Sequence, residues 1–339
     1  MAEIGGNITI SAPRKRVYNN ILETIGGTPL VKLNGVTDHS KIQPGTTVLV
    51  KLEFFNPMSS VKDRIALNIV YQALKDGRLK EGMEILEATS GNTGIGLCQV
   101  GAAYGFKVNI VMPSTMSVER QQIMKAFGAN LILTEGKLGM PGAIAHSENM
   151  VKENPGKYFV ADQFNNPDNT KAHAFTAQEI WEDTDGKVDI FISAVGTSGT
   201  LIGVGENLKQ KKNVKVIAVE PEESAVLEGK PKGPHGIQGI GAGFVPTIYK
   251  KDIVDEIIPI KTQDAWKTSR LVVKYDGIMV GMSSGAAILA GLREATKVEN
   301  KGKTIVVIVP SCGERYLSTD LYKTVDQGTK KEVLDTLLN

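Results

Sequence analysis

The sequence is poor in cysteine and contains no long hydrophobic run. Only two of its 339 residues are cysteines, Cys98 and Cys312, and both lie in apolar or glycine-rich stretches. A disulfide framework is therefore not expected, and a reducing, cytoplasmic environment is the default. No stretch approaches the roughly 20 apolar residues that a membrane-spanning helix needs, which argues against a membrane protein.

An excess of one charge and a metal-ligand pattern are also missing. The 39 Lys and Arg residues nearly balance the 37 Asp and Glu residues, so nothing points to a nucleic-acid or membrane partner. The four histidines lie far apart, and no His/Cys pair has ligand spacing, so no metal is expected. Residues 1–19 lack the hydrophobic region of a signal peptide, and we expect a short arm that packs on a partner subunit.

What the sequence does contain is an alternation of short β-branched runs with amphipathic stretches. The stretch Val61–Leu74, with Ile65, Ile69 and Ala73 at helical spacing, is typical of the latter. The alternation predicts an α/β fold with mostly parallel sheets covered by helices. The predicted strands are Thr47–Glu53, Glu84–Ala88, Lys107–Met112, Asn130–Leu133, Asp189–Ala194, Lys215–Glu220 and Thr304–Val309.

A segment rich in turn-forming residues, Gln163–Asn169, suggests a domain boundary. We therefore expect an N-terminal αβ domain of residues 1–166 and a C-terminal αβ domain of residues 167–327. Residues 328–339 would be a helical, peripheral tail. Domains of this kind commonly bind ligands between them, at the carboxyl ends of strands.

One loop between a predicted strand and a helix contains a lysine. In Asn56–Arg64, Ser59 or Ser60 is placed to cap the first turn, which puts Lys62 near a helix N-terminus. The helix dipole disfavours a positive charge there, whereas helices usually place lysine in their last turn. On this loop alone two interpretations stay open: a functional Lys62, or an exposed lysine paired with Asp63.

Two further loops combine glycines with small hydroxyl residues. Ala88–Gly94 would expose backbone N–H groups at a helix N-terminus, which suits a carboxylate or a phosphate. Val195–Leu201 offers donors to a phosphate monoester, but it lacks both the P-loop lysine and the Gly-x-Gly-x-x-Gly spacing of an NAD-dependent dehydrogenase. The segments Gly281–Ala286 and Gly239–Gly243 are weaker signals, and the second is more typical of a flexible loop.

Taken in order, these loops resemble the cysteine synthase (O-acetylserine sulfhydrylase) family of fold-type-II pyridoxal-phosphate enzymes. The resemblance runs from about Ile21 to Tyr322 and includes Thr24–Leu30, Pro113–Arg120 and Gly233–Phe244. It implies two three-layer αβα domains, a homodimer, and a mobile part at about residues 108–152 that closes over the substrate.

The resemblance also implies a role for each loop residue. Lys62 would carry pyridoxal 5′-phosphate as a Schiff base and take the Cα proton of the substrate. Asn92 would hydrogen-bond the 3′-oxygen of the cofactor, and Ser283 would face its pyridine nitrogen. The cofactor phosphate would be held by Gly196, Thr197, Ser198, Gly199 and Thr200. The substrate carboxylate would be held by Thr89, Ser90, Gly91, Thr93 and Gln163.

The implied reaction replaces the acetoxy group of O-acetyl-L-serine by sulfide, through an α-aminoacrylate, to give L-cysteine and acetate. O-Phosphoserine is an alternative donor, although the sequence places no clustered arginines near the substrate loops. A cystathionine β-synthase-like reaction with homocysteine is a second alternative; no regulatory domain and no N-terminal Cys–His pair support it. A non-catalytic scaffold is the third, and the intact Lys62, Asn92 and Ser283 argue against it.

Four residues depart from the family pattern. Met58 and Ser198 stand where smaller residues are usual; we expect Met58 to pack under the lysine loop and Ser198 to add a phosphate donor. Gly236 replaces a frequent lysine. Together with Ser114, it leaves open whether the C-terminal peptide of serine acetyltransferase binds at the mouth of the site, as it does in many family members.

Overall fold

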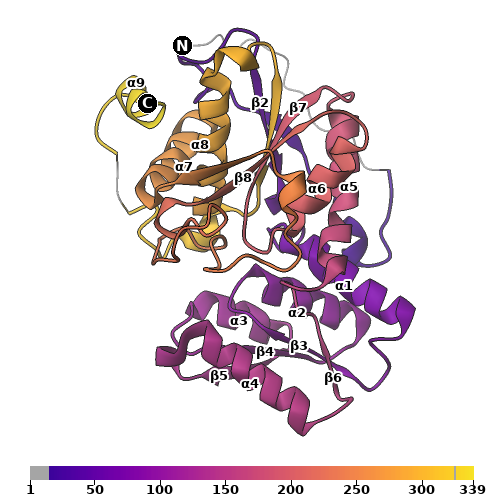
Figure 1. The fold of residues 1–339 in the computed structure, drawn as a ribbon. Helices are drawn as coiled ribbons and strands as arrows, with labels where there is room; N and C mark the ends of the chain where they lie inside the picture. Colours follow the sequence, from indigo (N-terminus) through magenta and orange to yellow (C-terminus); the bar gives the residue numbers. More distant parts are fainter. Residues whose placement is uncertain (1–14, 324–325) are drawn as a thin grey trace.

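The computed structural model describes residues 15–323 and 326–339, so most of the expected N-terminal arm lies outside the described residues. Two mostly parallel sheets, each between layers of helices, lie one above the other (Figure 1). The expected α/β fold with two three-layer units is confirmed. No described helix is long and apolar enough to cross a membrane.

The smaller sheet has four parallel strands in the order β5-β4-β3-β6. Helices α1 and α2 cover one face, where Ile85 and Ile110 point, and α4 covers the other, where Leu86 and Val111 meet Ala143. The elements of this unit are α1 (Lys62–Asp76), β3 (Glu84–Ala88), α2 (Asn92–Tyr104), β4 (Val108–Pro113), α3 (Val118–Ala126), β5 (Asn130–Thr134), α4 (Gly139–Glu153) and β6 (Tyr158–Val160).

The larger sheet has six strands in the order β1-β2-β10-β7-β8-β9, parallel except for the edge strand β1. Helices α5 and α6 pack against Phe191, Val216 and Val306 on one face, and α7 and α8 cover the other. Its elements are β1 (Leu30–Lys32), β2 (Thr47–Leu52), α5 (Pro167–Asp183), β7 (Val188–Ala194), α6 (Gly199–Lys209), β8 (Lys215–Pro221), β9 (Glu256–Ile260), α7 (Thr262–Asp276), α8 (Met282–Thr296) and β10 (Thr304–Val309).

The predicted strands are confirmed to within one or two residues at each end. They were detectable because strands of a parallel sheet are buried on both faces and form near-continuous apolar runs. The strands β1, β6 and β9 were not predicted. Two of them have only three residues, and β9 is partly exposed and contains Pro259, so none makes a clear apolar run.

The sheets divide the chain differently from the expected boundary near residue 166. Strand β2 lies in the larger sheet, where Thr47–Leu52 pairs in parallel with Thr304–Val309 of β10. The strands before α1 therefore belong to the larger sheet, and the sheet of the smaller unit is formed by the part from α1 to β6. Leu22, which also precedes α1, packs in the core of the smaller unit. This pairing joins opposite ends of the chain, so local sequence patterns could not indicate it.

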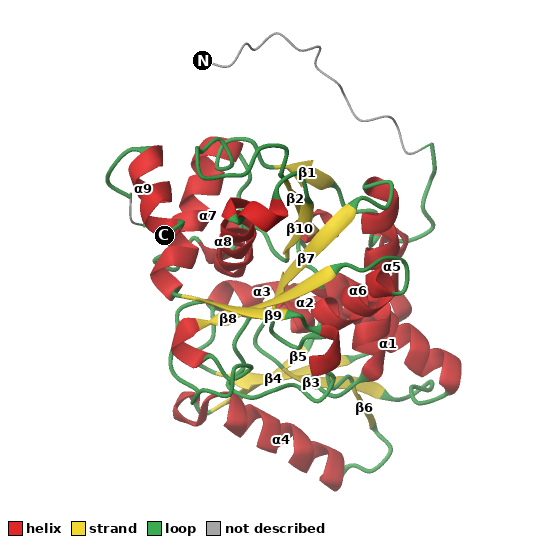
Figure 2. Cartoon of the chain, turned by 45° about the horizontal axis from the view of Figure 1, so that its top comes forward, coloured by secondary structure: helices red, strands yellow, loops and turns green. Residues whose placement is uncertain are grey.

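The C-terminal tail contains the expected helix, α9 (Lys330–Leu337), which begins with a capping box between Thr329 and Glu332. It is not peripheral in its packing, because Leu334 and Leu337 are fully buried in the same core cluster as α7 and α8. Figure 2 shows α9 beside these helices. Short 3₁₀ helices include η1 (Ile21–Thr24), η2 (Glu53–Phe55), η3 (Gly136–Leu138), η4 (Glu222–Ser224), η5 (Lys251–Ile253), η6 (Val298–Asn300) and η7 (Gly313–Tyr316).

Candidate active site

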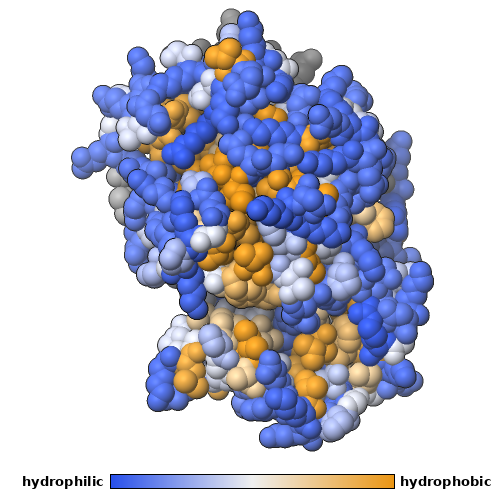
Figure 3. Space-filling view, viewed as in Figure 1, coloured by the Kyte–Doolittle hydropathy of each residue, from blue (hydrophilic) through white to orange (hydrophobic). Residues whose placement is uncertain are grey.

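A cleft of about 900 Å³ lies between the two units, at the carboxyl ends of strands from both sheets. Figure 3 shows the molecule narrowed between its upper and lower parts, with hydrophobic residues on both sides of the hollow. Every residue predicted to bind cofactor or substrate lines this cleft: Lys62, Thr89, Ser90, Gly91, Asn92, Thr93, Gln163, Gly196, Thr197, Ser198, Gly199, Thr200 and Ser283. Their individual roles stay predictions.

Lys62 is the first residue of α1 and faces the cleft. The N-cap of α1 is Val61 and not the expected serine, so the helix has no side-chain cap. The Ser60 hydroxyl lies one residue earlier and accepts a hydrogen bond from the Lys62 backbone N–H at 3.2 Å. Burial of the amine lowers the pKa of Lys62 to about 8. The alternative of an exposed lysine paired with Asp63 is wrong, because the Asp63 carboxylate instead accepts from the Met58 backbone N–H at 2.7 Å.

The loop Gly196–Thr200 lies at the junction of β7 and α6. At two of its glycines, other parts of the chain pack directly against the backbone. A Cβ at Gly196 would lie 2.5 Å from the carbonyl oxygen of Gly239, and one at Gly199 would lie 1.9 Å from the Oδ1 atom of Asn169. Neither position has room for a side chain. The approach of Gly239 also brings the loop Gly239–Gly243 to the wall of the cleft, so that segment is part of the site rather than a detached flexible loop.

The hydroxyl groups of this loop are suited to a phosphate. Ser198 has a left-handed backbone (φ 70°) at the start of α6, and its buried Oγ has no hydrogen-bond partner among the described residues. A buried hydroxyl without a partner is costly, so a ligand oxygen that accepts from it would be favoured. Thr197 Oγ1 accepts from Asn169 Nδ2 at 3.0 Å, which leaves its own hydroxyl hydrogen free to donate.

His173 supports the same loop, a role that sequence reasoning missed. Its Nε2 lies 3.2 Å from Thr200 Oγ1, and its Nδ1 lies 3.1 Å from Thr176 Oγ1. Complete burial lowers the pKa of His173 well below its usual value, so the imidazole is neutral at physiological pH. A lone histidine on a helix gave no sequence signal for this contact.

The loop after β3 meets a turn after β6. The Thr93 hydroxyl donates to Gln163 Oε1 at 2.6 Å, and because this occupies the amide oxygen, the amide N–H groups of Gln163 are left to donate elsewhere. Glu87, another cleft residue missed in the sequence, accepts from the backbone N–H of Asp162 at 2.8 Å and that of Gln163 at 3.3 Å. Burial raises the pKa of Glu87 to about 7.

Two arginines lie beside these loops, contrary to the expectation that no arginines gather there. Arg120, on α3, lines the cleft and donates to the Ser90 carbonyl at 3.2 Å and to Gln238 Oε1 at 3.1 Å. Arg315, in η7, donates to Asn92 Oδ1. Sequence analysis did not predict either contact, because both arginines are distant from these loops in sequence.

The departures Met58 and Gly236 each have a structural explanation. Met58 packs against the core cluster of the smaller unit and does not line the cleft, as expected for a residue under the lysine loop. At Gly236 a Cβ would lie 2.6 Å from Thr262 Cγ2 and 2.9 Å from Trp266 Cζ2. A lysine at this position would therefore require Trp266 to move.

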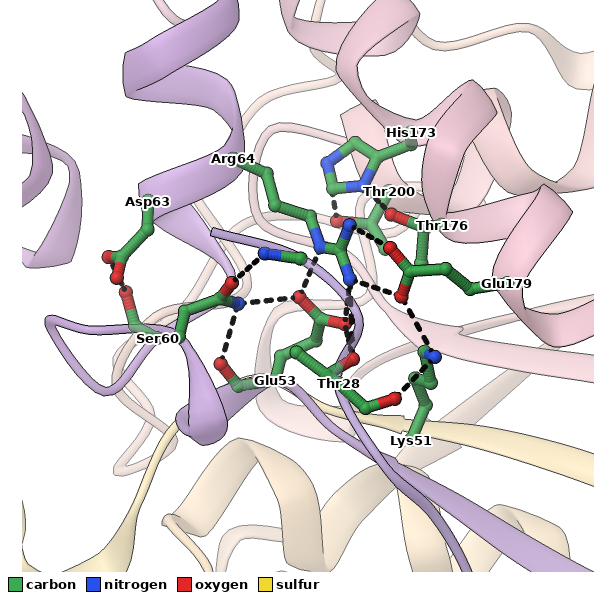
Figure 4. Close-up of polar contacts among 12 residues, drawn as sticks. Thr28, Lys51, Glu53, Ser60, Asp63, Arg64, His173, Thr176, Glu179 and Thr200 are labelled. Carbon is green, nitrogen blue, oxygen red and sulfur yellow. Dashed lines mark hydrogen bonds and ion pairs between the residues drawn. The ribbon is translucent and has the colours of Figure 1, made fainter. Parts of the chain in front are cut away.

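A buried ionic cluster around Arg64, two residues after Lys62 on α1, joins this helix to the larger unit (Figure 4). Arg64 donates to both oxygens of Glu53 (2.6 and 3.0 Å) and to both oxygens of Glu179 (2.8 and 2.7 Å). Lys51, fully buried on β2, lies 2.9 Å from Glu179 and donates to the Thr28 carbonyl at 2.6 Å. The cluster joins α1, β2, η2 and α5, so the helix that begins with Lys62 has one position relative to both sheets.

The family of this chain is settled by its match to known proteins. The pyridoxal-phosphate-dependent enzyme family model matches residues 21–311. The chain belongs to this family. It is 47% identical over 329 residues to cysteine synthase A of Escherichia coli K12, covering 94% of this chain and 99% of that protein.

Solved structures in the family agree. The cysteine synthase of Entamoeba histolytica is 77% identical, with a TM-score of 0.97 over 98% of this chain and 99% of that one. The O-acetylserine-dependent cystathionine β-synthase of Helicobacter pylori is 34% identical, with a TM-score of 0.84 over 91% and 99%. The resemblance to cysteine synthases, the fold type, the enzyme class and the cofactor pyridoxal 5′-phosphate are thereby confirmed.

The ionic cluster predicts an acid-sensitive contribution to stability. Burial raises the pKa of Glu179, but hydrogen bonds and charges from Arg64 and Lys51 outweigh it and bring the pKa down to about 2. The carboxylate therefore stabilises the fold above pH 4.5, and this contribution is lost as the pH falls toward 2. We expect Glu179→Gln to reduce the free energy of unfolding at pH 7 by about 2–3 kcal/mol.

Urea denaturation at several pH values would measure this effect. The difference between Glu179→Gln and the unmodified chain should shrink below pH 4.5. Glu148→Gln, an exposed position on α4, serves as the control and should change stability by less than about 0.5 kcal/mol. A difference that is constant with pH would contradict the assignment.

The lowered pKa of Lys62 predicts how the apoprotein takes up its cofactor. Only a neutral amine attacks an aldehyde, so the rate of holoprotein formation should rise with pH and level off above about pH 8. Stopped-flow absorbance of apoprotein mixed with pyridoxal phosphate would record this profile. Nα-Acetyl-lysine under the same conditions should continue to gain rate to about pH 10.4; an apoprotein profile that follows the free amine would contradict the burial argument.

Proposed function

We propose that this enzyme replaces the acetoxy group of O-acetyl-L-serine by sulfide, giving L-cysteine and acetate. The observation that carries the proposal is the placement of Lys62, whose pKa burial lowers to about 8, in one cleft with the loop of Ser198. The buried hydroxyl of Ser198 has no hydrogen-bond partner among the described residues. An amine and a phosphate-binding loop of this kind suit a covalently held cofactor that carries a phosphate. The cysteine synthases among the relatives support the choice of substrates.

In this proposal the cofactor is held by groups on both sides of the cleft. Lys62 Nζ holds it covalently, and Ser198, Thr197 and Thr200 donate to its phosphate together with backbone N–H groups of Gly196 and Gly199. Ser283, only 3% exposed at the start of α8, faces the ring nitrogen, and Asn92 faces the ring oxygen. When bound, pyridoxal phosphate supplies an electron sink for negative charge at the substrate Cα.

The substrate is oriented by the loop after β3. Backbone N–H groups of Ser90 and Gly91 and the hydroxyl groups of Thr89 and Ser90 lie near the N-terminus of α2, where the helix dipole favours a carboxylate. The amide N–H of Gln163, left free by the Thr93 contact, supplies a further donor. With the carboxylate held there, the substrate amine would displace Lys62 Nζ, which in its neutral form would take the Cα proton while the Cβ–O bond breaks and acetate leaves. Hydrosulfide would then form the Cβ–S bond, and Lys62 would return the proton to Cα.

Part of the smaller unit closes over the substrate in this proposal, at about residues 108–152. In this part α3 buries Met124 and α4 buries Ala143 and Ser147, so both helices are weakly anchored. The strand β4 pairs with β3 over Ile85–Ala88, so closure should move α3 and α4 more than β4. Hydrogen exchange with and without a bound amino acid tests this: protection should increase in α3 and α4, and unchanged exchange there would contradict closure.

A second candidate substrate is a phosphorylated serine in place of O-acetyl-L-serine. The position of Arg120 in the cleft favours this candidate. Arg120 lines the cleft next to Ser90, and its buried Nε has no hydrogen-bond partner among the described residues. O-Phospho-L-serine therefore belongs in the assay beside O-acetyl-L-serine, and homocysteine beside sulfide. The homodimer and the interaction with serine acetyltransferase stay predictions; the mass in solution, with and without the acetyltransferase peptide, would test them.

The absorption spectrum of the holoenzyme, followed by product analysis, tests the proposed reaction. The visible band of the cofactor should move when O-acetyl-L-serine is added alone and return when sulfide is added, with L-cysteine released. Lys62→Ala should lower kcat at least 10³-fold because it removes both the covalent link and the base. Lys75→Ala, an exposed lysine of the same helix, is the matched control.

Three results would change the conclusion. A band that responds only to O-phospho-L-serine would move the proposal to the second donor. Release of cystathionine in preference to cysteine would assign homocysteine as the nucleophile. An apoprotein that cannot be reconstituted with pyridoxal phosphate would overturn the catalytic proposal as a whole.

A further inference from the structure

Arg315 joins two parts of the cleft that are far apart in the sequence. It comes from η7, which follows β10 and belongs to the larger unit. One terminal nitrogen donates to Asn92 Oδ1 at 2.7 Å, across 223 residues of sequence, and the other donates to the carbonyl of Met58 at 2.8 Å. The contact therefore links the first residue of α2 to the loop that carries Lys62.

The contact determines which way the Asn92 amide faces. A guanidinium group has donors and no acceptor, so only the amide oxygen of Asn92 can lie against Arg315. The Asn92 Nδ2 group is consequently directed away from Arg315, and Asn92 lines the cleft. Without this partner, the two ends of an asparagine amide are nearly equal in shape, and either could face a ligand.

Two charged side chains, Asp63 and Arg315, hold the lysine loop at Met58. The Met58 peptide donates its N–H to Asp63 and accepts at its carbonyl from Arg315. Burial raises the pKa of Asp63 to about 7, and the charge of Arg315 opposes that rise. The other titratable groups that act on Arg315 are Tyr316, Arg120 and Cys312.

We propose that Arg315 is a positioning residue for the cofactor: by occupying Asn92 Oδ1, it directs Asn92 Nδ2 at the ring oxygen of pyridoxal phosphate. A donor fixed at that place stabilises the oxygen in its anionic form. This inference rests on the proposed function, in which Asn92 faces the ring oxygen. Through Arg315, η7 would influence the ionisation of the cofactor ring oxygen. None of the loops predicted from the sequence includes η7.

The pH titration of the visible band of the holoenzyme tests the inference, because a purely structural Arg315 would leave the midpoint unchanged. The midpoint should shift by about one pH unit in Asn92→Ala, and Arg315→Gln should shift it in the same direction. The double variant should match Asn92→Ala alone, since Arg315 acts through Asn92. Arg293→Gln, which removes another arginine that donates to a backbone carbonyl, should leave the midpoint unchanged.

The outcomes separate this inference from the proposed function. A shift in Asn92→Ala with none in Arg315→Gln, or additive shifts in the double variant, would overturn the role of Arg315 and leave the proposed function intact. A reconstituted protein without any visible band would overturn both. If Arg315→Gln does not fold, Arg315→Lys decides: a partial shift in the direction of Asn92→Ala supports the inference, and an unchanged midpoint overturns it.

Discussion

The buried ionic cluster around Arg64 is the constraint on which the arrangement of the cleft depends. Arg64 is paired at both ends with carboxylates from the larger unit, and it lies half a turn along α1 from Lys62. Pairs of this kind add little net stability compared with apolar packing, but a broken pair is costly. We infer that the cluster restricts α1 to one position between the two sheets.

The same helix that supplies Glu179 to this cluster also supplies His173, which contacts Thr200 of the loop Gly196–Thr200. Helix α5 therefore fixes two parts of the site at once, the lysine on one side and Thr200 on the other. Because His173 is neutral and fully buried, its contact with Thr200 should be insensitive to pH in the physiological range. The cleft is thus held in shape by groups that do not line it.

The sequence predicted the loops of the site and missed the residues that support them. Thr89–Thr93 and Gly196–Thr200 could be found because each is a short segment rich in glycine and hydroxyl residues after an apolar strand. Glu87, Arg120, His173 and Arg315 could not, because each acts through a partner that is distant in sequence. The place of β2 in the larger sheet was missed for the same reason, because its pairing with β10 is long-range.

The sequence by itself determined the α/β class, seven of the ten described strands, the loops rich in glycine and hydroxyl residues, and the candidate lysine. Their periodicity and composition are local properties, and local properties can be read along the chain. Only the tertiary structure decided that the amine of Lys62 is buried, that Arg315 donates to the amide oxygen of Asn92, and that Gly236 has no room for a side chain. A pKa, an amide orientation and a steric limit all depend on atoms that folding brings close from elsewhere in the chain.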